Sequence, residues 1–367
     1  MKLNRLAQLG AITAIAALSL TACAANEPAA NGNTPAPSDS TTTLSGTLNA
    51  TGASSQDAAQ QAWVAAFQTA NNGVTVNYQA TGSGVGRDNF LSGGQSFIGS
   101  DRAFDADEIA AGGFGSCASD AIVEVPVYIS PVAIIFNLDG VDSLNLDAAT
   151  VAKIFNGDIT KWNDAAIAAD NPDATLPDLA ISPVHRSDPS GTSEIFTGYL
   201  AAVAPDAWPH EESDQWPLQS GEAAQGTSGV VAAVNGGSGT IGYADASQAG
   251  NLGTVAVKVG EDFVPYSSEA AAALVDASPL AEGRSEGDLV FEVDPAAAPA
   301  GSYPIALVSY LIACEKYDDT ATADLVRAYF EFVTSADGQD VAAEAAGSAP
   351  LSDSLREKIN AAIALIG

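Results

Sequence analysis

Short runs of β-branched residues alternate with helical patterns of apolar residues along the chain from residue 44 onward. Strand patterns cover 73–78, 122–127, 132–136, 179–184, 240–243 and 303–312. Helical patterns cover 56–70, 147–155, 193–203, 230–234, 321–333 and 352–366. Such alternation is typical of sheets covered by helices. The sequence therefore predicts an α/β fold with mixed, mostly parallel sheets.

The composition limits the possible partners. The chain has 367 residues, of which 47% are hydrophobic, so it is long enough for about two packed domains. Acidic residues outnumber basic ones by 45 to 13, and the formal charge of −32 disfavours nucleic acid and anionic membrane surfaces. With three Cys and two His, a zinc cluster is not expected. We expect no metal and no cofactor.

The N-terminus has the pattern of an export signal. Lys2 and Arg5 precede an apolar stretch at 6–20, which is shorter than the ~20 residues of a spanning helix. The stretch ends in Leu-Thr-Ala before Cys23, which resembles a bacterial lipobox. This predicts a signal peptide at 1–22 and a lipid on the cysteine. The alternative is an ordinary secretory signal beside an incidental cysteine.

Residues 23–43 are predicted to be a flexible tether that follows the lipid. The segment is rich in Ala, Asn, Pro, Ser and Thr and has few large apolar side chains, so it cannot form a core. Cys117 and Cys314 are then the remaining cysteines. Because thiols outside the cytoplasm are often oxidised, we expect one disulfide between them; two separately buried thiols are the alternative.

Three predicted strand-to-helix junctions are rich in glycine and hydroxyl side chains. They are Gly-Ala-Ser-Ser at 52–55, Thr-Gly-Ser-Gly-Val-Gly at 81–86 and Ser-Asp-Pro-Ser-Gly-Thr-Ser at 187–193. Serine and threonine can cap the next helix, whereas free N–H groups at a helix N-terminus attract anions. Capping explains any one junction, but three in one chain favour an oxyanion site. The negative net charge does not oppose such a site, because distant charges are screened over ~8–10 Å.

Several segments together resemble the phosphate-binding subunit of bacterial ABC phosphate importers. The loop at 184–193 is similar to the family's Arg-x-Asp-x-Ser-Gly-Thr-Ser sequence. Further similar segments are Tyr-Gln-Ala-Thr-Gly-Ser at 78–83, Ile-Gly-Ser-Asp at 98–101, Phe-Asn-Gly-Asp-Ile-Thr-Lys-Trp-Asn at 155–163 and Gly-Thr-Ile-Gly-Tyr at 239–243. The resemblance implies a type II-like periplasmic-binding-protein fold, with two α/β domains, a ligand cleft between them and two hinge crossings.

The expected crossings divide the chain unevenly. We place the first near 130–132 and the return near 304–307. Domain I then combines 44–130 with 307–367, and domain II covers 131–306.

The resemblance also implies which residues hold phosphate. Arg186 is expected to pair with phosphate oxygens in fork geometry, while Asp188 orients its guanidinium. Hydroxyl or backbone N–H donors are expected from Ser54, Ser55, Ser83, Ser190, Gly191 and Thr192. Ser54 and Ser55 stand where the family usually has threonine and an aromatic residue, so this edge keeps a hydroxyl and lacks the family's ring.

Asp101 is the informative position, because a carboxylate repels an anion unless the anion brings a proton. Hydrogen phosphate has this proton at neutral pH and sulfate does not, so Asp101 predicts discrimination against sulfate. The alternative is a solvated turn aspartate. The neighbouring Arg102 is expected to face solvent rather than to attract the anion.

The resemblance implies a lipid-anchored receptor on the outer face of the cytoplasmic membrane. It would bind inorganic phosphate and deliver it, by hinge closure, to the membrane permease subunits of an ABC importer. We expect a monomer that binds no nucleic acid, meets the membrane only through its lipid and catalyses no reaction.

Two alternatives use the same loops. A phosphoester hydrolase is disfavoured because His185, Asp188 and Ser190 lie within six residues, whereas a catalytic triad needs histidine between serine and the acid. The loop at 81–86 also lacks the Lys-Ser/Thr of a phosphate-binding P-loop. A binder of another oxyanion, such as sulfate or molybdate, is the second alternative.

Overall fold

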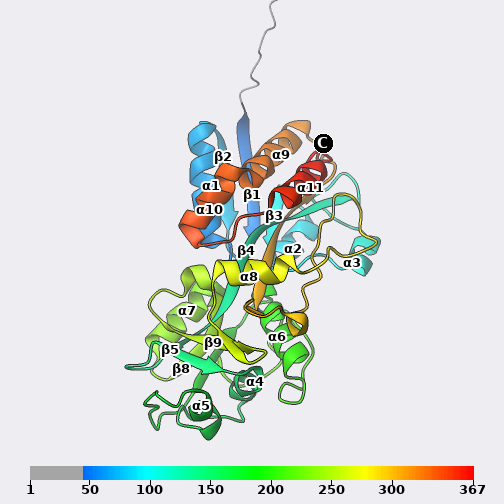
Figure 1. Cartoon of the computed structure of the whole chain (residues 1–367). Helices are drawn as coiled ribbons and strands as arrows, with labels where there is room; N and C mark the ends of the chain where they lie inside the picture. The colour runs from blue at the N-terminus through cyan, green and yellow to red at the C-terminus, as the bar shows by residue number, and fades with distance from the viewer. Residues whose placement is uncertain (1–43) are drawn as a thin grey trace, which may run out of the picture. The chain divides into compact units, whose positions relative to one another are not determined.

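Strand β4 (Ile122–Asn137) connects the two halves of the molecule in the computed structural model, which describes residues 44–367 (Figure 1). Its first ten residues, 122–131, lie along strand β11 (Ala306–Cys314), and its last six pair with β8 (Thr240–Asp245); both pairings are antiparallel. The predicted signal peptide, Cys23 and the tether lie outside the described residues. We call the β11 side of the sheet the first lobe and the β8 side the second lobe.

The strands form one mixed sheet of 11 strands in the order β2-β1-β3-β11-β4-β8-β6-β7, with β9 also pairing with β4, β5 and β10. Their bounds are β1 Ser45–Gly52, β2 Gly73–Gln79, β3 Phe97–Ser100, β5 Ser143–Leu146, β6 Ser182–Arg186, β7 Glu222–Ala224, β9 Gly253–Val259 and β10 Asp262–Val264. Five pairings are parallel and five antiparallel. The expected α/β fold with a mixed sheet is confirmed, but parallel pairings do not predominate as predicted, because β4, β11 and β9 supply every antiparallel pairing.

Helices cover the sheet in both lobes (Figure 1). The first lobe has α1 Asp57–Ala70, α2 Ser83–Ser92, α3 Ala106–Ala111, α9 Thr320–Thr334, α10 Ala336–Ala346 and α11 Asp353–Ile363. The second has α4 Ala148–Asn156, α5 Ala165–Asp170, α6 Gly191–Val203 and α7 Gly226–Gly236, while α8 Ser268–Asp276 packs on β4 and β11. Serine or aspartate side chains cap many of these helices at their N-termini, among them Asp147, Ser190, Asp319 and Ser352.

The two strand patterns at 122–127 and 132–136 form one strand rather than two, although prolines interrupt them. Ser309 of β11 lies opposite Tyr128, and Tyr310 opposite Pro126, so Val127 is an extra residue at a bulge. A bulge is one place where a strand accommodates proline, which has no N–H to donate. β4 changes partners between residues 131 and 132, at the expected first crossing; the division into two domains there stays a prediction.

Each lobe has an aromatic core. In the first lobe, Phe97 contacts the rings of Tyr329 and Phe330 at centroid distances of 5.2 and 5.5 Å. In the second, Phe196 stacks on Tyr243 at 4.4 Å. Each such buried ring stabilises the fold by roughly 1.5–3 kcal/mol. No helix within residues 44–367 has the length and apolar content needed to cross a bilayer.

Cys117 and Cys314 form the expected disulfide, with Cα atoms 5.2 Å apart. The bond joins the segment after α3 to the last residue of β11, across 197 residues of sequence. Closing so long a loop restricts the unfolded chain strongly and is expected to stabilise the fold by about 2–5 kcal/mol.

Candidate functional site

The predicted site residues lie where loops of the two lobes meet. Ser54 and Ser55 follow β1, Ser83 begins α2 and Asp101 follows β3, all in the first lobe. In the second lobe, Arg186 ends β6, Ser190 caps α6, and Gly191 and Thr192 are the first residues of that helix. Because β1, β2 and β3 are parallel, their carboxyl ends share one edge of the sheet, the usual place for a ligand site in α/β proteins.

Asp101 is the meeting point of these loops and is only 6% exposed. Its Oδ1 accepts a hydrogen bond from Ser55 Oγ (2.6 Å) and its Oδ2 one from Thr192 Oγ1 (3.0 Å). Its backbone N–H donates to Ser83 Oγ (3.1 Å). Burial raises the pKa of Asp101, although the hydroxyl donors and the charge of Arg186 oppose this shift. The solvated-turn alternative for Asp101 is therefore wrong.

Arg186 forms a two-point ion pair with Asp188. Nε donates to Oδ1 at 2.9 Å and Nη2 to Oδ2 at 2.5 Å, and the Arg186 side chain is 2% exposed. Asp188 Oδ1 also accepts from the N–H of Gly226 (3.0 Å). Burial disfavours the charged aspartate, but the hydrogen bond and charge of Arg186 together hold the pKa of Asp188 below its usual range. The pair fixes the guanidinium plane, and within residues 44–367 no hydrogen bond uses its Nη1.

Two glycines let the lobes approach closely. A Cβ at Gly82 would lie 2.5 Å from Asp188 Oδ2, and one at Gly191 would lie 2.6 Å from the Cβ of Asp101. Gly82 also has a φ of 101°, which side chains rarely allow. Both positions therefore need glycine for the observed contact between lobes.

Ser190 caps its own helix and still has a proton to give. Its Oγ accepts from the N–H of Ser193 at 3.3 Å. A hydroxyl that accepts at a cap keeps its O–H as a donor.

A fourth helix N-terminus, that of α7, also lies here and was not among the three predicted junctions. The N–H of Thr227 donates to Ser54 Oγ (3.1 Å), and the two hydroxyls lie 3.0 Å apart. Gln248 Nε2 donates to the carbonyl of Ser54 (3.1 Å). The sequence Gln-Gly-Thr-Ser at 225–228 precedes a predicted helix and is the same kind of junction as the other three, so it could have been included.

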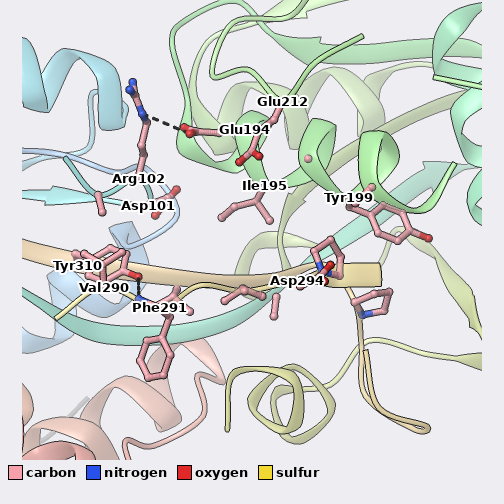
Figure 2. A pocket seen from close by; sticks show the side chains of 18 of the residues that line it. Asp101, Arg102, Glu194, Ile195, Tyr199, Glu212, Val290, Phe291, Asp294 and Tyr310 are labelled. Atoms are coloured by element: carbon pink, nitrogen blue, oxygen red, sulfur yellow. Dashed lines mark hydrogen bonds and ion pairs between the residues drawn. The ribbon is translucent and has the colours of Figure 1, made fainter. Parts of the chain in front are cut away.

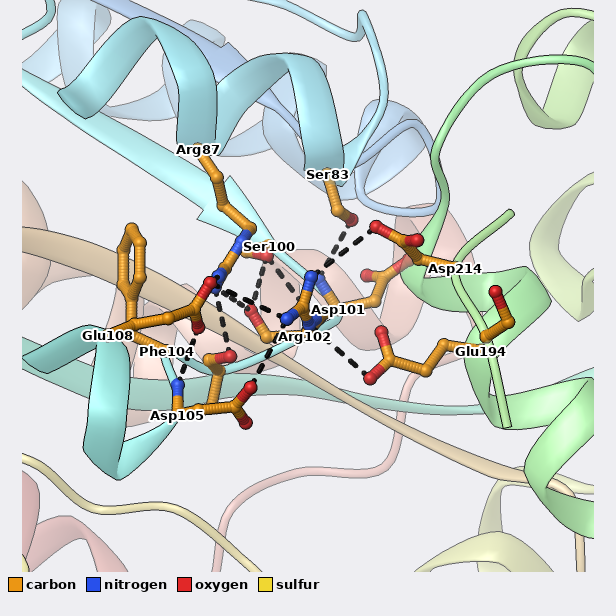
Figure 3. Close-up of polar contacts among 12 residues, drawn as sticks. Ser83, Arg87, Ser100, Asp101, Arg102, Phe104, Asp105, Glu108, Glu194 and Asp214 are labelled. Carbon is orange, nitrogen blue, oxygen red and sulfur yellow. Dashed lines mark hydrogen bonds and ion pairs between the residues drawn. The ribbon is translucent and has the colours of Figure 1, made fainter. Parts of the chain in front are cut away.

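Arg102 does not face solvent as expected; it lies among four carboxylates (Figure 3). Two belong to its own lobe and two to the second lobe, with N–O distances of 3.3 Å to Asp105, 3.5 Å to Glu108, 3.4 Å to Glu194 and 3.4 Å to Asp214. The strongly acidic surroundings explain the correction, because a guanidinium is drawn to nearby carboxylates. Its side chain is 24% exposed.

Arg102, with Arg87 paired to Glu108 at 2.6 Å, does not compensate all these acids. Burial, together with the neighbouring carboxylates of Glu212 and Asp214, raises the pKa of Glu194 to about 7 despite the opposing charge of Arg102. Burial also raises the pKa of Glu212. We call Arg102 with Asp105, Glu108, Glu194 and Asp214 the Arg102 cluster.

A pocket of about 470 Å³ adjoins Asp101 and the Arg102 cluster (Figure 2). Glu194, Ile195 and Glu212 line it on one side, and Phe291 and Tyr310 on another. No group of three or more metal-ligating side chains suited to a metal ion occurs among residues 44–367.

The geometry does not assemble a hydrolase triad. The ring of His185 stacks on Trp216 at 5.0 Å, and its Nδ1 contacts the carbonyl of Arg186 (2.9 Å). The Oγ of Ser190 is engaged with its helix. No hydrogen bond between His185 and Ser190 occurs among the described residues, so His185 is not placed as a base for this serine in the observed geometry.

A protein-family comparison matches residues 37–337 to the PBP superfamily domain. The chain is 36% identical to the phosphate-binding protein PstS 3 of Mycobacterium tuberculosis over 372 aligned positions, covering 99% of both chains. It is 35% identical to PstS 2 of the same organism, covering 86% of each. Among solved structures, a high-affinity periplasmic phosphate-binding protein (PfluDING) bound with phosphate has a TM-score of 0.72 at 24% identity. It covers 86% of this chain and 93% of its own, which supports the fold.

Proposed function

Because the chain belongs to the family of phosphate-binding proteins within the PBP superfamily, we propose that it binds inorganic phosphate outside the cytoplasm and delivers it to the permease subunits of an ABC importer. The observation that carries the proposal is the meeting of Asp101, from the first lobe, with Arg186 and Thr192 from the second. The protein acts as a receptor and catalyses no reaction.

The proposed ligand set combines one guanidinium with neutral donors. Arg186 binds phosphate oxygens, and Asp188 orients it without competing for both terminal nitrogens. Ser54, Ser55, Ser83, Ser190, Gly191 and Thr192 supply hydroxyl or N–H donors at the N-termini of α1, α2 and α6. We add Thr227 at the start of α7, because it contacts Ser54 from the opposite lobe.

Asp101 supplies the selectivity in this proposal. Its carboxylate accepts the proton of hydrogen phosphate, whereas sulfate would face it with an unprotonated oxygen. An unpaired carboxylate against a dianion in a buried site is costly, so sulfate is rejected.

Phosphate is captured and released as two domains move relative to each other. Domain I covers 44–130 plus 307–367, and domain II covers 131–306. Hinge bending at the β4 and β11 crossings separates the contacts of Asp101 with Thr192 and of Ser54 with Thr227. After residues 1–22 are removed, a lipid on Cys23 would hold this monomeric receptor on the outer face of the cytoplasmic membrane.

Isothermal titration calorimetry with phosphate and sulfate tests the function. We expect tight, saturable phosphate binding and little heat with sulfate at neutral pH. Asp101→Asn should bring the two affinities closer together, because an amide can donate to an unprotonated oxygen. Equal binding of the two ions by the unaltered protein would contradict the proposal.

A further inference from the structure

A chain of buried hydrogen bonds runs through the first lobe from helix α9 to Asp101. Tyr329 Oη donates to Gln60 Oε1 and Gln60 Nε2 to Gln56 Oε1, both at 2.8 Å. Gln56 Nε2 donates to Ser309 Oγ and Ser309 Oγ to Asp101 Oδ1, both at 2.6 Å. The four residues before Asp101 are at most 1% exposed. We call these four residues the amide relay.

The backbone carbonyl of Tyr310 fixes the direction of the amide relay. Gln56 Nε2 donates to this carbonyl as well, at 3.0 Å. A carbonyl oxygen can only accept, so the amide nitrogen of Gln56 must face it, and the same nitrogen faces Ser309 Oγ. Since Ser309 Oγ accepts from Gln56, its single proton is directed to Asp101.

The far end of the relay has the same polarity. Burial raises the pKa of the Tyr329 phenol, so Tyr329 keeps its proton and donates. The two glutamines between Tyr329 and Ser309 do not titrate. No member of the relay can therefore reverse the direction in which Ser309 points its hydroxyl.

The two carboxylate oxygens of Asp101 accept hydrogen bonds from different donors. Oδ1 accepts from both Ser55 and Ser309 at 2.6 Å, the short distance typical of a charged acceptor. Oδ2 accepts from Thr192 alone among the residues described, at 3.0 Å. Oδ2 is therefore the oxygen that retains accepting capacity for a further donor.

We propose that Ser309, Gln56, Gln60 and Tyr329 are positioning residues that keep Asp101 a hydrogen-bond acceptor, so that its Oδ2 accepts only from a protonated oxyanion. This inference rests on the phosphate-binding function proposed above and adds to it the buried residues that set selectivity. The relay acts by donating to Oδ1, which stabilises the charged form of Asp101. A protonated Asp101 would instead be able to donate a hydrogen bond to sulfate.

The groups near Asp101 allow the loss of the Ser309 donor to change the pKa of its carboxyl. Burial raises the pKa of its carboxyl, and Ser309, Ser55, Thr192 and Arg186 oppose the rise. The phenol of Tyr78 on β2 donates to the carbonyl of Ala53 at 2.9 Å and keeps its own proton, because burial and the charge of Asp101 raise its pKa. The neighbouring Arg102 directs its guanidinium to the acids of the Arg102 cluster. Loss of the Ser309 donor thus raises the pKa of Asp101 further.

The test compares Ser309→Ala and Gln56→Met with the unaltered protein. Calorimetry from pH 5 to 8 gives the ratio of phosphate to sulfate affinity, and carbon-13 spectroscopy of labelled aspartate follows the titration of Asp101. We expect the ratio at pH 5 to fall at least about tenfold, as for a lost hydrogen bond to a charged group. The titration midpoint should move up by about one pH unit. Ser309→Thr, which keeps the hydroxyl, should restore both.

Gln339→Met is the matched control. Gln339 is also buried in the first lobe and makes three hydrogen bonds, to Val127, Val333 and Leu351, but it does not join the relay. The control should lose stability as Gln56→Met does and keep the affinity ratio and the midpoint unchanged.

The outcomes separate the relay from the function. If the unaltered protein binds no phosphate, the proposed function is wrong. If it prefers phosphate and the folded relay variants keep its ratio and midpoint, the relay is rejected. Tyr329→Phe removes only the terminal donor and should change both values in the same direction by less; should Ser309→Ala fail to fold, this variant and Gln56→Met decide the matter.

Discussion

Two arginines lie near the junction between the lobes, and their surroundings differ. Arg186 is 2% exposed and is held by one carboxylate through two hydrogen bonds, whereas Arg102 is 24% exposed and has four carboxylates within 3.5 Å. The difference teaches that the number of carboxylates around a guanidinium, rather than the net charge of the chain, determines how much of its hydrogen-bonding capacity is already used. Arg186 keeps donor capacity for a ligand, and Arg102 serves to bridge the lobes.

Replacing Arg186 should produce the largest effect. Arg186→Ala removes the charged donor of the proposed site and leaves Asp188 buried without its cation, so we expect phosphate affinity to fall at least about 100-fold. Calorimetry measures the loss, and circular dichroism checks that the variant is folded. A folded variant with unchanged affinity would remove Arg186 from the site.

Asp188→Asn tests whether the single carboxylate orients Arg186. The amide can accept on one side only, so the guanidinium loses its two-point contact, and we expect about a tenfold loss of phosphate affinity. Asp214→Asn in the Arg102 cluster is the comparison, with an expected loss below about threefold, because three other carboxylates remain. Equal losses in the two variants would abolish the distinction between the arginines.

The pH dependence of the free energy of unfolding, compared between the unaltered protein and Glu194→Gln, tests whether the acids around Arg102 are compensated. The folded-state pKa of Glu194 is raised to about 7 by burial, so its stabilising protonation is complete below about pH 4.5 and is lost as pH rises through 7. The free energy of unfolding of the unaltered protein should therefore fall relative to the glutamine variant by about 1–2 kcal/mol between pH 5 and 8. Chemical denaturation at both pH values measures this. Parallel pH profiles would show that Arg102 fully compensates the cluster.

Arg102→Ala should change binding far less than Arg186→Ala does. It removes partly exposed ion pairs between the lobes, which contribute about 0–1 kcal/mol each. We expect phosphate affinity to weaken less than about fivefold, and calorimetry at low and high salt should show the difference shrinking as salt increases. A loss comparable to that of Arg186→Ala would place Arg102 in the site itself.

The sequence predicts the elements that carry strong local patterns. Helix α6 and strand β2 follow their apolar periodicity closely, and the loop at 184–193 identifies the Arg186–Asp188 pair through its resemblance to a family. Local pattern could not show that 122–127 and 132–136 form one strand, because this depends on the bulge opposite Ser309. Contacts made across the fold are the part that local sequence does not encode.

The missed residues have the same explanation. Ser309 is a polar residue inside an apolar run, which marks it as unusual but does not say that it meets Asp101. Gln56 joins the relay only because β11 passes beside the start of α1. The environment of Arg102 was predicted wrongly because two of its four acids come from the second lobe.

The backbone-to-side-chain approach at Gly191 gives a way to weaken the receptor without removing any hydrogen-bonding group. A single methyl group at this position would act as a spacer against Asp101, since its carbon would lie 2.6 Å from another carbon. Such a protein keeps all the chemistry of recognition and loses only the final fraction of an ångström of approach. At this position the space between the lobes therefore has room for a hydrogen atom but not for a methyl group.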